Sequence, residues 1–161
     1  MKVCNAEAMK KVKSLEDDIL TLRYNENMNS TVSYKEGETK TEVNYDYKAT
    51  RKSIEKLNAE IRRIKNALSV ANSTYVIDGF GITIGEALVY LAQLNREREI
   101  VSELANRNKL SRRITSNGVI EYTECTYDPE QAHKDQKALY EKISKLQVAI
   151  DRANLTCMIE I

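Results

Sequence analysis

The fold is decided by residues 47–71, YKATRKSIEKLNAEIRRIKNALSVA, in which apolar residues recur at alternating steps of three and four. This spacing places them on one stripe of an α-helix and leaves most of the charged residues outside it. The stripe extends over more than three heptads, which favours coiled-coil-like packing against another helix. Its members are Tyr47, Thr50, Ile54, Leu57, Ile61, Ile64, Leu68 and Ala71.

Three other segments carry the same periodicity and predict helices over about 3–24, 84–108 and 129–154. Two of them have clear start signals. Thr83 and Glu86 form a capping box, and Asp128 with Pro129 supplies an N-cap followed by proline at the first helical position. The expected inward residues are Ala8, Val12, Leu15, Ile19 and Leu22; Ala87, Leu88, Leu91, Leu94, Val101 and Leu104; and Ala132, Gln136, Leu139, Ile143, Leu146, Ile150 and Ala153. Arg98 interrupts the third stripe, so we expect it to reach the edge or to pair with a carboxylate.

The connections between these helices read as β-hairpins over about 30–45, 74–82 and 112–126. Asp78-Gly79 and Asn117-Gly118 are favoured two-residue turns because both positions tolerate positive φ. The first hairpin, around Glu36-Gly37, is rich in threonine and charge, so we expect it to be exposed. Since two strands alone are marginal in water, it should be mobile unless it docks on something.

The composition favours a helical domain. The chain has 161 residues, with only five glycines and one proline, which argues against an all-β fold. Short links between long helices make successive helices antiparallel. We therefore predict an all-α chain forming one domain over 1–161, an up-down-up-down four-helix bundle with the apolar tail NLTCMIEI lying against it.

The charge balance bounds the partners. Lys and Arg number 25 against 24 Asp and Glu, giving a formal net charge of +1. Proteins that bind nucleic acid or anionic membranes usually carry a larger basic excess, so we expect neither partner. Three widely spaced cysteines suggest no disulfide framework, and the polar start MKVCNAEAMKK lacks a secretory signal. These features favour a cytoplasmic protein.

No motif carries identifiable chemistry. Cys125 and His133 could form a nucleophile–base pair in a suitable fold, but a packed cysteine and a solvated histidine explain them better. Glu130 and His133 have the spacing of a di-metal helix motif, yet the chain has no second histidine. Gly79-Phe80-Gly81 lacks the lysine of a phosphate-binding loop, so turn chemistry explains it. We predict no catalytic, cofactor-binding or metal residues and no identifiable small-molecule ligand.

Three segments resemble a family of small bacterial proteins called septicolysin-like. They are Asn66–Asn72 followed by Asp78-Gly79, the helix start Thr83–Leu88, and the closing segment Ala153–Thr156. The chain departs from the family at Leu155, where a tryptophan is usual. The resemblance implies an all-helical fold, and the family label implies a pore-forming toxin.

The expected function is non-enzymatic: a helical-bundle protein that acts by contact with other proteins and by self-association. The long heptad stripe and the exposed β-edges support it, because an unpaired strand edge is a template for another chain. Two alternatives remain open at this point. One is a membrane-active, pore-forming protein, and the other is an enzyme with an unrecognised site.

Overall fold

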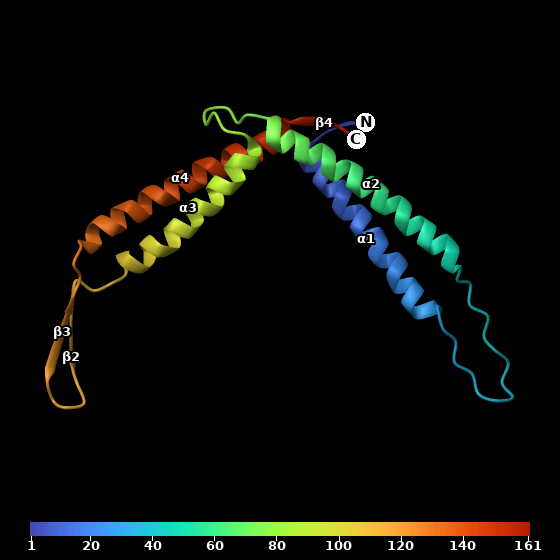
Figure 1. The fold of residues 1–161 in the computed structure, drawn as a ribbon, viewed down its shortest axis with the longest axis horizontal. Helices are drawn as coiled ribbons and strands as arrows, with labels where there is room; N and C mark the ends of the chain where they lie inside the picture. The colour runs from blue at the N-terminus through green and yellow to red at the C-terminus, as the bar shows by residue number, and fades with distance from the viewer. The chain divides into compact units, whose positions relative to one another are not determined.

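The chain is mainly helical, as predicted, with two small antiparallel strand pairs (Figure 1). The computed structural model describes all residues, 1–161. Its internal contacts divide the chain into two compact units, one formed by Met1–Tyr75 with Asn154–Ile161 and the other by Val76–Ala153. The single four-helix bundle over the whole chain stays a prediction.

All four predicted helices are present. The elements are β1 (Lys2–Cys4), α1 (Asn5–Asn29), α2 (Tyr47–Thr74), α3 (Ile84–Ala105), β2 (Leu110–Ile114), β3 (Ile120–Glu124), α4 (Pro129–Thr156) and β4 (Met158–Glu160). The largest boundary difference is at α1, which was predicted to end near Tyr24 and continues through the polar run to Asn29. That run contains neither glycine nor proline, and the Asn29 side chain donates a hydrogen bond to the Asn25 carbonyl.

In the first unit, α1 and α2 form an antiparallel pair closed by the predicted stripes. Ala8, Val12, Leu15 and Ile19 of α1 are buried, and Leu22 is half-buried. On α2 the buried residues are Ile54, Ile61, Ile64 and Ala71, whereas Tyr47 at the helix start is exposed. Ion pairs flank the seam at Lys11–Glu60 (2.9 Å) and Lys65–Glu16 (2.7 Å).

One polar pair interrupts the apolar seam. Asn5 is buried, and its side-chain amide donates a 3.3 Å hydrogen bond to the side-chain oxygen of Asn72. A buried asparagine in a helical seam finds a partner in one alignment only, and it thereby fixes the register of the helices. The Asn5–Asn72 pair therefore sets how α1 lies along α2.

The two ends of the chain pair with each other, which the sequence did not predict for the N-terminus. β1 and β4 are antiparallel, with Val3 opposite Ile159, and the terminal ammonium of Met1 donates to the Ile161 carbonyl at 2.8 Å. Cys157, Ile159 and Ile161 are buried. The apolar tail is thus held in the first unit by backbone pairing as well as by burial.

The predicted hairpin over 30–45 is wrong, because no strand forms there. The two arms are extended on either side of a turn at Glu36-Gly37, without a ladder of hydrogen bonds between them. Most of this segment is exposed, so no packed layer covers its alternating valine and tyrosine side chains to hold a strand pair together in water. The connection returns to α2 through Asp46, whose side chain caps the helix.

In the second unit, α3 and α4 are antiparallel, and Ala87, Leu94, Leu146 and Ile150 of the predicted stripes are buried. Leu88, which was expected to point inward, is instead 46% exposed. Polar contacts also join the two helices. The Gln136 amide donates to the Ser102 hydroxyl at 2.9 Å. Arg98, which interrupts the third stripe, lies over the ring of Tyr140 at 5.4 Å, a cation–π contact in place of the expected carboxylate.

The other two predicted hairpins lie in this unit as well. Over 74–82 the turn forms with Gly79 at φ 81°, but the strands reduce to one bridge between Val76 and Thr83. The hairpin over 112–126 is confirmed as β2 and β3, joined by a tight turn in which Gly118 has φ 76°.

We predict that Ile64→Ala lowers the free energy of unfolding by about 2–5 kcal/mol, because Ile64 is fully buried in the α1–α2 seam. Val70→Ala on the same helix is the matched control, since Val70 is 55% exposed, and it should change stability by less than about 0.5 kcal/mol. Urea denaturation followed by circular dichroism measures both. Equal effects of the two substitutions would contradict the assignment of the seam.

We predict that Thr83→Ala lowers stability by about 1 kcal/mol, because the Thr83 hydroxyl accepts from the Glu86 amide at the start of α3. The Thr83 amide and hydroxyl also donate to the Glu86 carboxylate, and these bonds lower the pKa of Glu86 below 4.5. The Glu86 contribution is therefore present above pH 4.5 and is lost as the pH falls through the lowered pKa.

Denaturation of Thr83→Ala at neutral and acid pH checks this prediction, with Thr39→Ala in the exposed connection as control. The difference in free energy of unfolding between Thr83→Ala and the control should shrink at acid pH. A difference that is constant over the whole range would show that the Thr83 hydroxyl does not bond to the Glu86 carboxylate.

Candidate functional site

The side chains first considered for catalysis are not brought together. The thiol of Cys125 donates to the Asn108 carbonyl at 3.3 Å, and the side chain is half-buried. His133 is exposed in the first turns of α4 and shares no hydrogen bond with Cys125. No group of three or more His, Cys, Asp or Glu side chains is placed to hold a metal ion.

None of the four helices combines the length and the apolar character needed to cross a lipid bilayer.

The most unusual surface is on the two-stranded ribbon formed by β2 and β3. Leu110 pairs with Glu124, Arg112 with Tyr122, and Ile114 with Ile120. Alternate residues of a strand point to the same side, so these six side chains share one side of the ribbon. We call it the apolar face; it comprises Leu110, Arg112, Ile114, Ile120, Tyr122 and Glu124.

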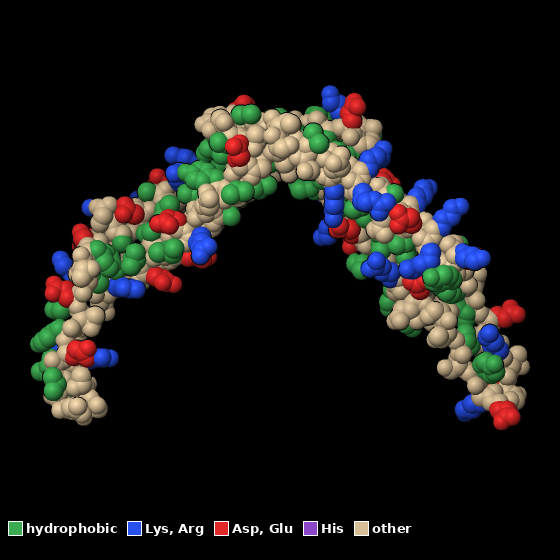
Figure 2. All heavy atoms as spheres, in the orientation of Figure 1, with side chains coloured by type: hydrophobic (Ala, Val, Ile, Leu, Met, Phe, Trp, Pro, Cys, Tyr) green, Lys and Arg blue, Asp and Glu red, His purple; other side chains and the backbone are tan.

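The apolar face is uncovered. Leu110, Ile114, Ile120 and Tyr122 are 58%, 68%, 44% and 62% exposed. In Figure 2, hydrophobic side chains gather along the ribbon. Soluble proteins seldom leave such side chains contiguous and open to water unless the patch binds something.

The opposite side of the ribbon is polar and complete in itself. Ser111, Arg113, Glu121 and Thr123 lie there, and Arg113 makes a 2.7 Å ion pair with Glu121 across the strands. The ribbon is therefore amphipathic. Its polar side carries an ion pair within the chain, whereas its apolar face is open to water.

The base of the ribbon is anchored to the end of α3. The Tyr127 hydroxyl donates to the Leu104 carbonyl at 2.7 Å, and the Cys125 amide donates to the Lys109 carbonyl at 2.9 Å. Burial, with a contribution from the neighbouring Cys125 thiol, raises the pKa of Tyr127. A hollow of about 430 Å³ lies beside these residues, lined by both polar and apolar atoms. These anchors hold the ribbon in place whether or not its face is covered.

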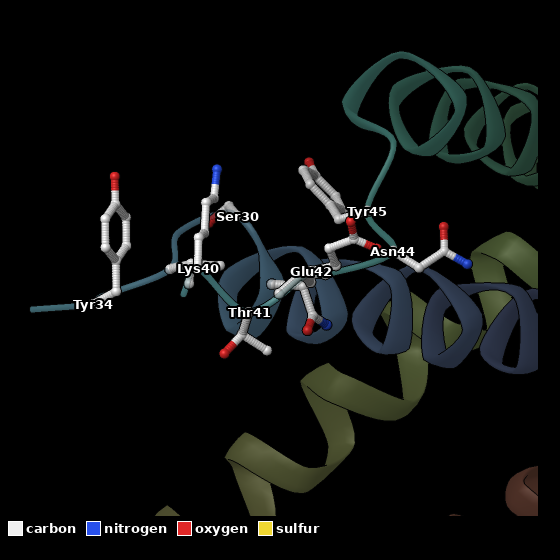
Figure 3. A pocket seen from close by; sticks show the side chains of 10 residues that line it. Ser30, Tyr34, Lys40, Thr41, Glu42, Asn44 and Tyr45 are labelled. Atoms are coloured by element: carbon white, nitrogen blue, oxygen red, sulfur yellow. The ribbon is translucent and has the colours of Figure 1, made fainter. Parts of the chain in front are cut away.

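A larger hollow, of about 950 Å³, lies between the two extended arms of residues 30–45 (Figure 3). Its lining is mainly polar, with Lys40, Thr41, Glu42 and Asn44 along one arm. Small-molecule sites are concave and mostly apolar, with a few polar groups that fix the ligand. This open space between two connecting arms does not have those properties.

The arm that leads into α2 is fixed by a charged cluster. The Tyr45 hydroxyl donates to Glu26 of α1 at 2.6 Å, and Arg51 of α2 pairs with the same carboxylate. The hydrogen bond to this carboxylate, more than burial, raises the pKa of Tyr45 to about 12. Tyr45 therefore ties the end of the connection to both helices of the first unit.

A third hollow, of about 510 Å³, lies between α2 and β4 and is mostly apolar. Ala67, Val70 and Ala71 line one side, and Cys157 with Ile159 lines the other. Burial raises the pKa of the Cys157 thiol, which keeps it protonated and unreactive. Glu160 is the only charged residue in this lining, so the hollow offers no cluster of charged groups to a ligand.

Comparison with known proteins gives a fold but no function. No protein-family model and no curated protein matches the chain. A solved structure described as a functionally unknown conserved protein from Corynebacterium diphtheriae is similar, with a TM-score of 0.66 and 19% sequence identity. The likeness covers 99% of this chain and 100% of that one. At this identity it shows a shared fold alone.

We predict that tyrosinate absorbance has a last titration phase near pH 12, removed by Tyr45→Phe. Because the folded pKa lies above the ordinary value of 10, the Tyr45–Glu26 bond stabilises the protein fully below pH 10 and is lost as the pH rises through 12. Glu26→Gln keeps an acceptor but removes the charge, so it should move the phase to lower pH. If the titration phase near pH 12 is unchanged in both variants, the hydrogen bond between Tyr45 and Glu26 is contradicted.

Proposed function

We propose that this chain is a non-enzymatic protein that acts by protein–protein contact, including association with copies of itself. The observation that carries the proposal is the apolar face, where four large hydrophobic side chains are between 44% and 68% exposed on one side of the ribbon. Protein interfaces are enriched in aromatic residues and arginine around an apolar core, and Tyr122 and Arg112 form the middle row of this face.

The ribbon itself also favours a partner. Two strands alone are marginal in water, and a hydrophobic face packed on another element is what makes such a pair stable. Within the chain, β2 and β3 have only each other as strand neighbours. A partner that covers the apolar face would supply the missing layer.

The free energies of burial and of association together favour a partner that brings an apolar surface of its own. Covering four half-exposed side chains gains on the order of 1 kcal/mol each. That sum only balances the roughly 4 kcal/mol or more that association costs. A second apolar face of the same size doubles the gain to about 8 kcal/mol. This exceeds the lower end of the association cost, and a second copy of the chain provides such a face.

Other parts of the proposal come from the sequence alone. They are a cytoplasmic location, membership of the septicolysin-like family, and the up-down-up-down bundle of four helices. The alternating three-and-four stripes support the bundle, and the segments Asn66–Asn72, Thr83–Leu88 and Ala153–Thr156 support the family.

The two alternatives have less support. An enzyme that uses Cys125 and His133 is not favoured, because the thiol is bonded to the Asn108 carbonyl and the imidazole is exposed without a bond to it. No feature of the chain favours the membrane-active alternative that the family label suggests.

We predict that the purified chain forms larger species as its concentration rises. Light scattering coupled to size-exclusion chromatography, from micromolar to millimolar concentration, measures the mass directly. A second series in high salt should retain the association, because burial of apolar surface rather than exposed charge drives it. A mass that stays that of one chain at every concentration would remove self-association from the proposal.

A further inference from the structure

We infer that the apolar face packs on the same face of a second copy, with the two ribbons parallel and Arg112 of each copy over the Tyr122 ring of the other. This inference rests on the proposed function and names the surface and the arrangement of its self-association. The inference follows from the order of the side chains on the apolar face. That order decides which side chains of the two copies would meet in each alignment of the ribbons.

The face has three rows of two side chains, set by the register of β2 and β3. Leu110 and Glu124 form the row at the base, Arg112 and Tyr122 the middle row, and Ile114 and Ile120 the row near the turn. A two-fold contact places the same patch on both copies, so each row meets a row of the partner copy. Only two alignments of the ribbons keep the strands nearly parallel to one another, as packed sheets require.

In the first alignment the ribbons point the same way, and the two-fold axis runs along the strands. The β2 strand of each copy then lies over the β3 strand of the other copy. Ile114 meets Ile120, and Arg112 meets the ring of Tyr122, where a guanidinium is attracted to the face of the aromatic ring. Glu124 is one row from the arriving Arg112, on the diagonal that long side chains can reach.

In the second alignment the ribbons point in opposite directions. The β2 strand of each copy then lies over the β2 strand of the other copy. The middle row then places Arg112 directly over Arg112, and the outer rows place Glu124 over Ile120. Like charges in direct opposition are destabilising. The Glu124 carboxylate does not distinguish the two alignments, because the parallel one places it over Leu110. The charge pattern of the face therefore selects the parallel alignment.

Arg112 is available for this contact. It is exposed on the ribbon, and it makes no ion pair and no ring contact within its own chain. Arg113, its neighbour in sequence, is on the polar side and is already paired with Glu121. The two arginines thus have the same charge and the same strand but different roles, which makes them a matched pair for mutation.

The size of the face sets the strength of the contact. Six side chains from each copy are far fewer than the roughly 20–30 residues per side of a standard stable interface. The inferred contact is therefore reversible and depends on concentration, and single substitutions on the face should shift it measurably.

The test is sedimentation equilibrium of the full chain and of three variants, each checked by NMR for an intact ribbon. Arg112→Gln should weaken self-association by about 4- to 25-fold, because two symmetry-related arginine–ring contacts are lost, each worth about a factor of 2 to 5 at an exposed site. Tyr122→Leu, which keeps an apolar side chain but removes the ring, should weaken it similarly. Arg113→Gln should leave the association constant unchanged.

Each outcome decides between the arrangements. Stronger association in Arg112→Gln would show Arg112 against Arg112 and overturn the parallel alignment. Equal association constants in all four proteins would show that the copies associate through another surface, which overturns this inference and leaves the proposed self-association standing. A wild-type chain that stays monomeric throughout would overturn both.

Discussion

The pairing of α1 with α2 through one apolar stripe on each helix is the constraint from which the rest of the structure follows. Residues spaced by three and four lie on a single stripe, so each helix can be covered from one side only. In the first unit that side is closed by Ile64 and its neighbours, with the Asn5–Asn72 bond setting the register. Apolar side chains off the stripes must then be covered by something else or stay in water.

A contiguous group of such side chains lies on the ribbon of the second unit, and its local chemistry explains how the group is held together. The tight turn at Gly118 and the backbone pairing hold β2 and β3 in one register, while Tyr127 secures the base to α3. These contacts favour the ribbon's conformation within one chain, and a partner on its apolar face would stabilise it further. A preformed surface loses little conformational entropy on binding, so even a small apolar face can contribute to association.

Much of the fold could be predicted from the sequence, because stripes, caps and turns are local signals. Thr83 with Glu86 marked the start of α3, and Asn117-Gly118 marked the β2–β3 turn. The strand β1 was missed because three residues give no periodicity, and its pairing depends on a segment at the other end of the chain. The segment 30–45 was misread because alternating valine and tyrosine suggest strands, yet no apolar layer covers them. The apolar face could have been found from the period-two positions Leu110, Arg112 and Ile114, but its exposure required the structure.

The central claim is that a second copy of the chain covers the ribbon's apolar face. The most direct measurement is an isotope-filtered NOE experiment on a mixture of methyl-labelled and unlabelled chains at high concentration. The account predicts contacts between the Ile114 methyl groups of one copy and the Ile120 methyl groups of the other. Ribbon methyl signals that do not move with concentration, together with an absence of any contact between copies on this face, would contradict it.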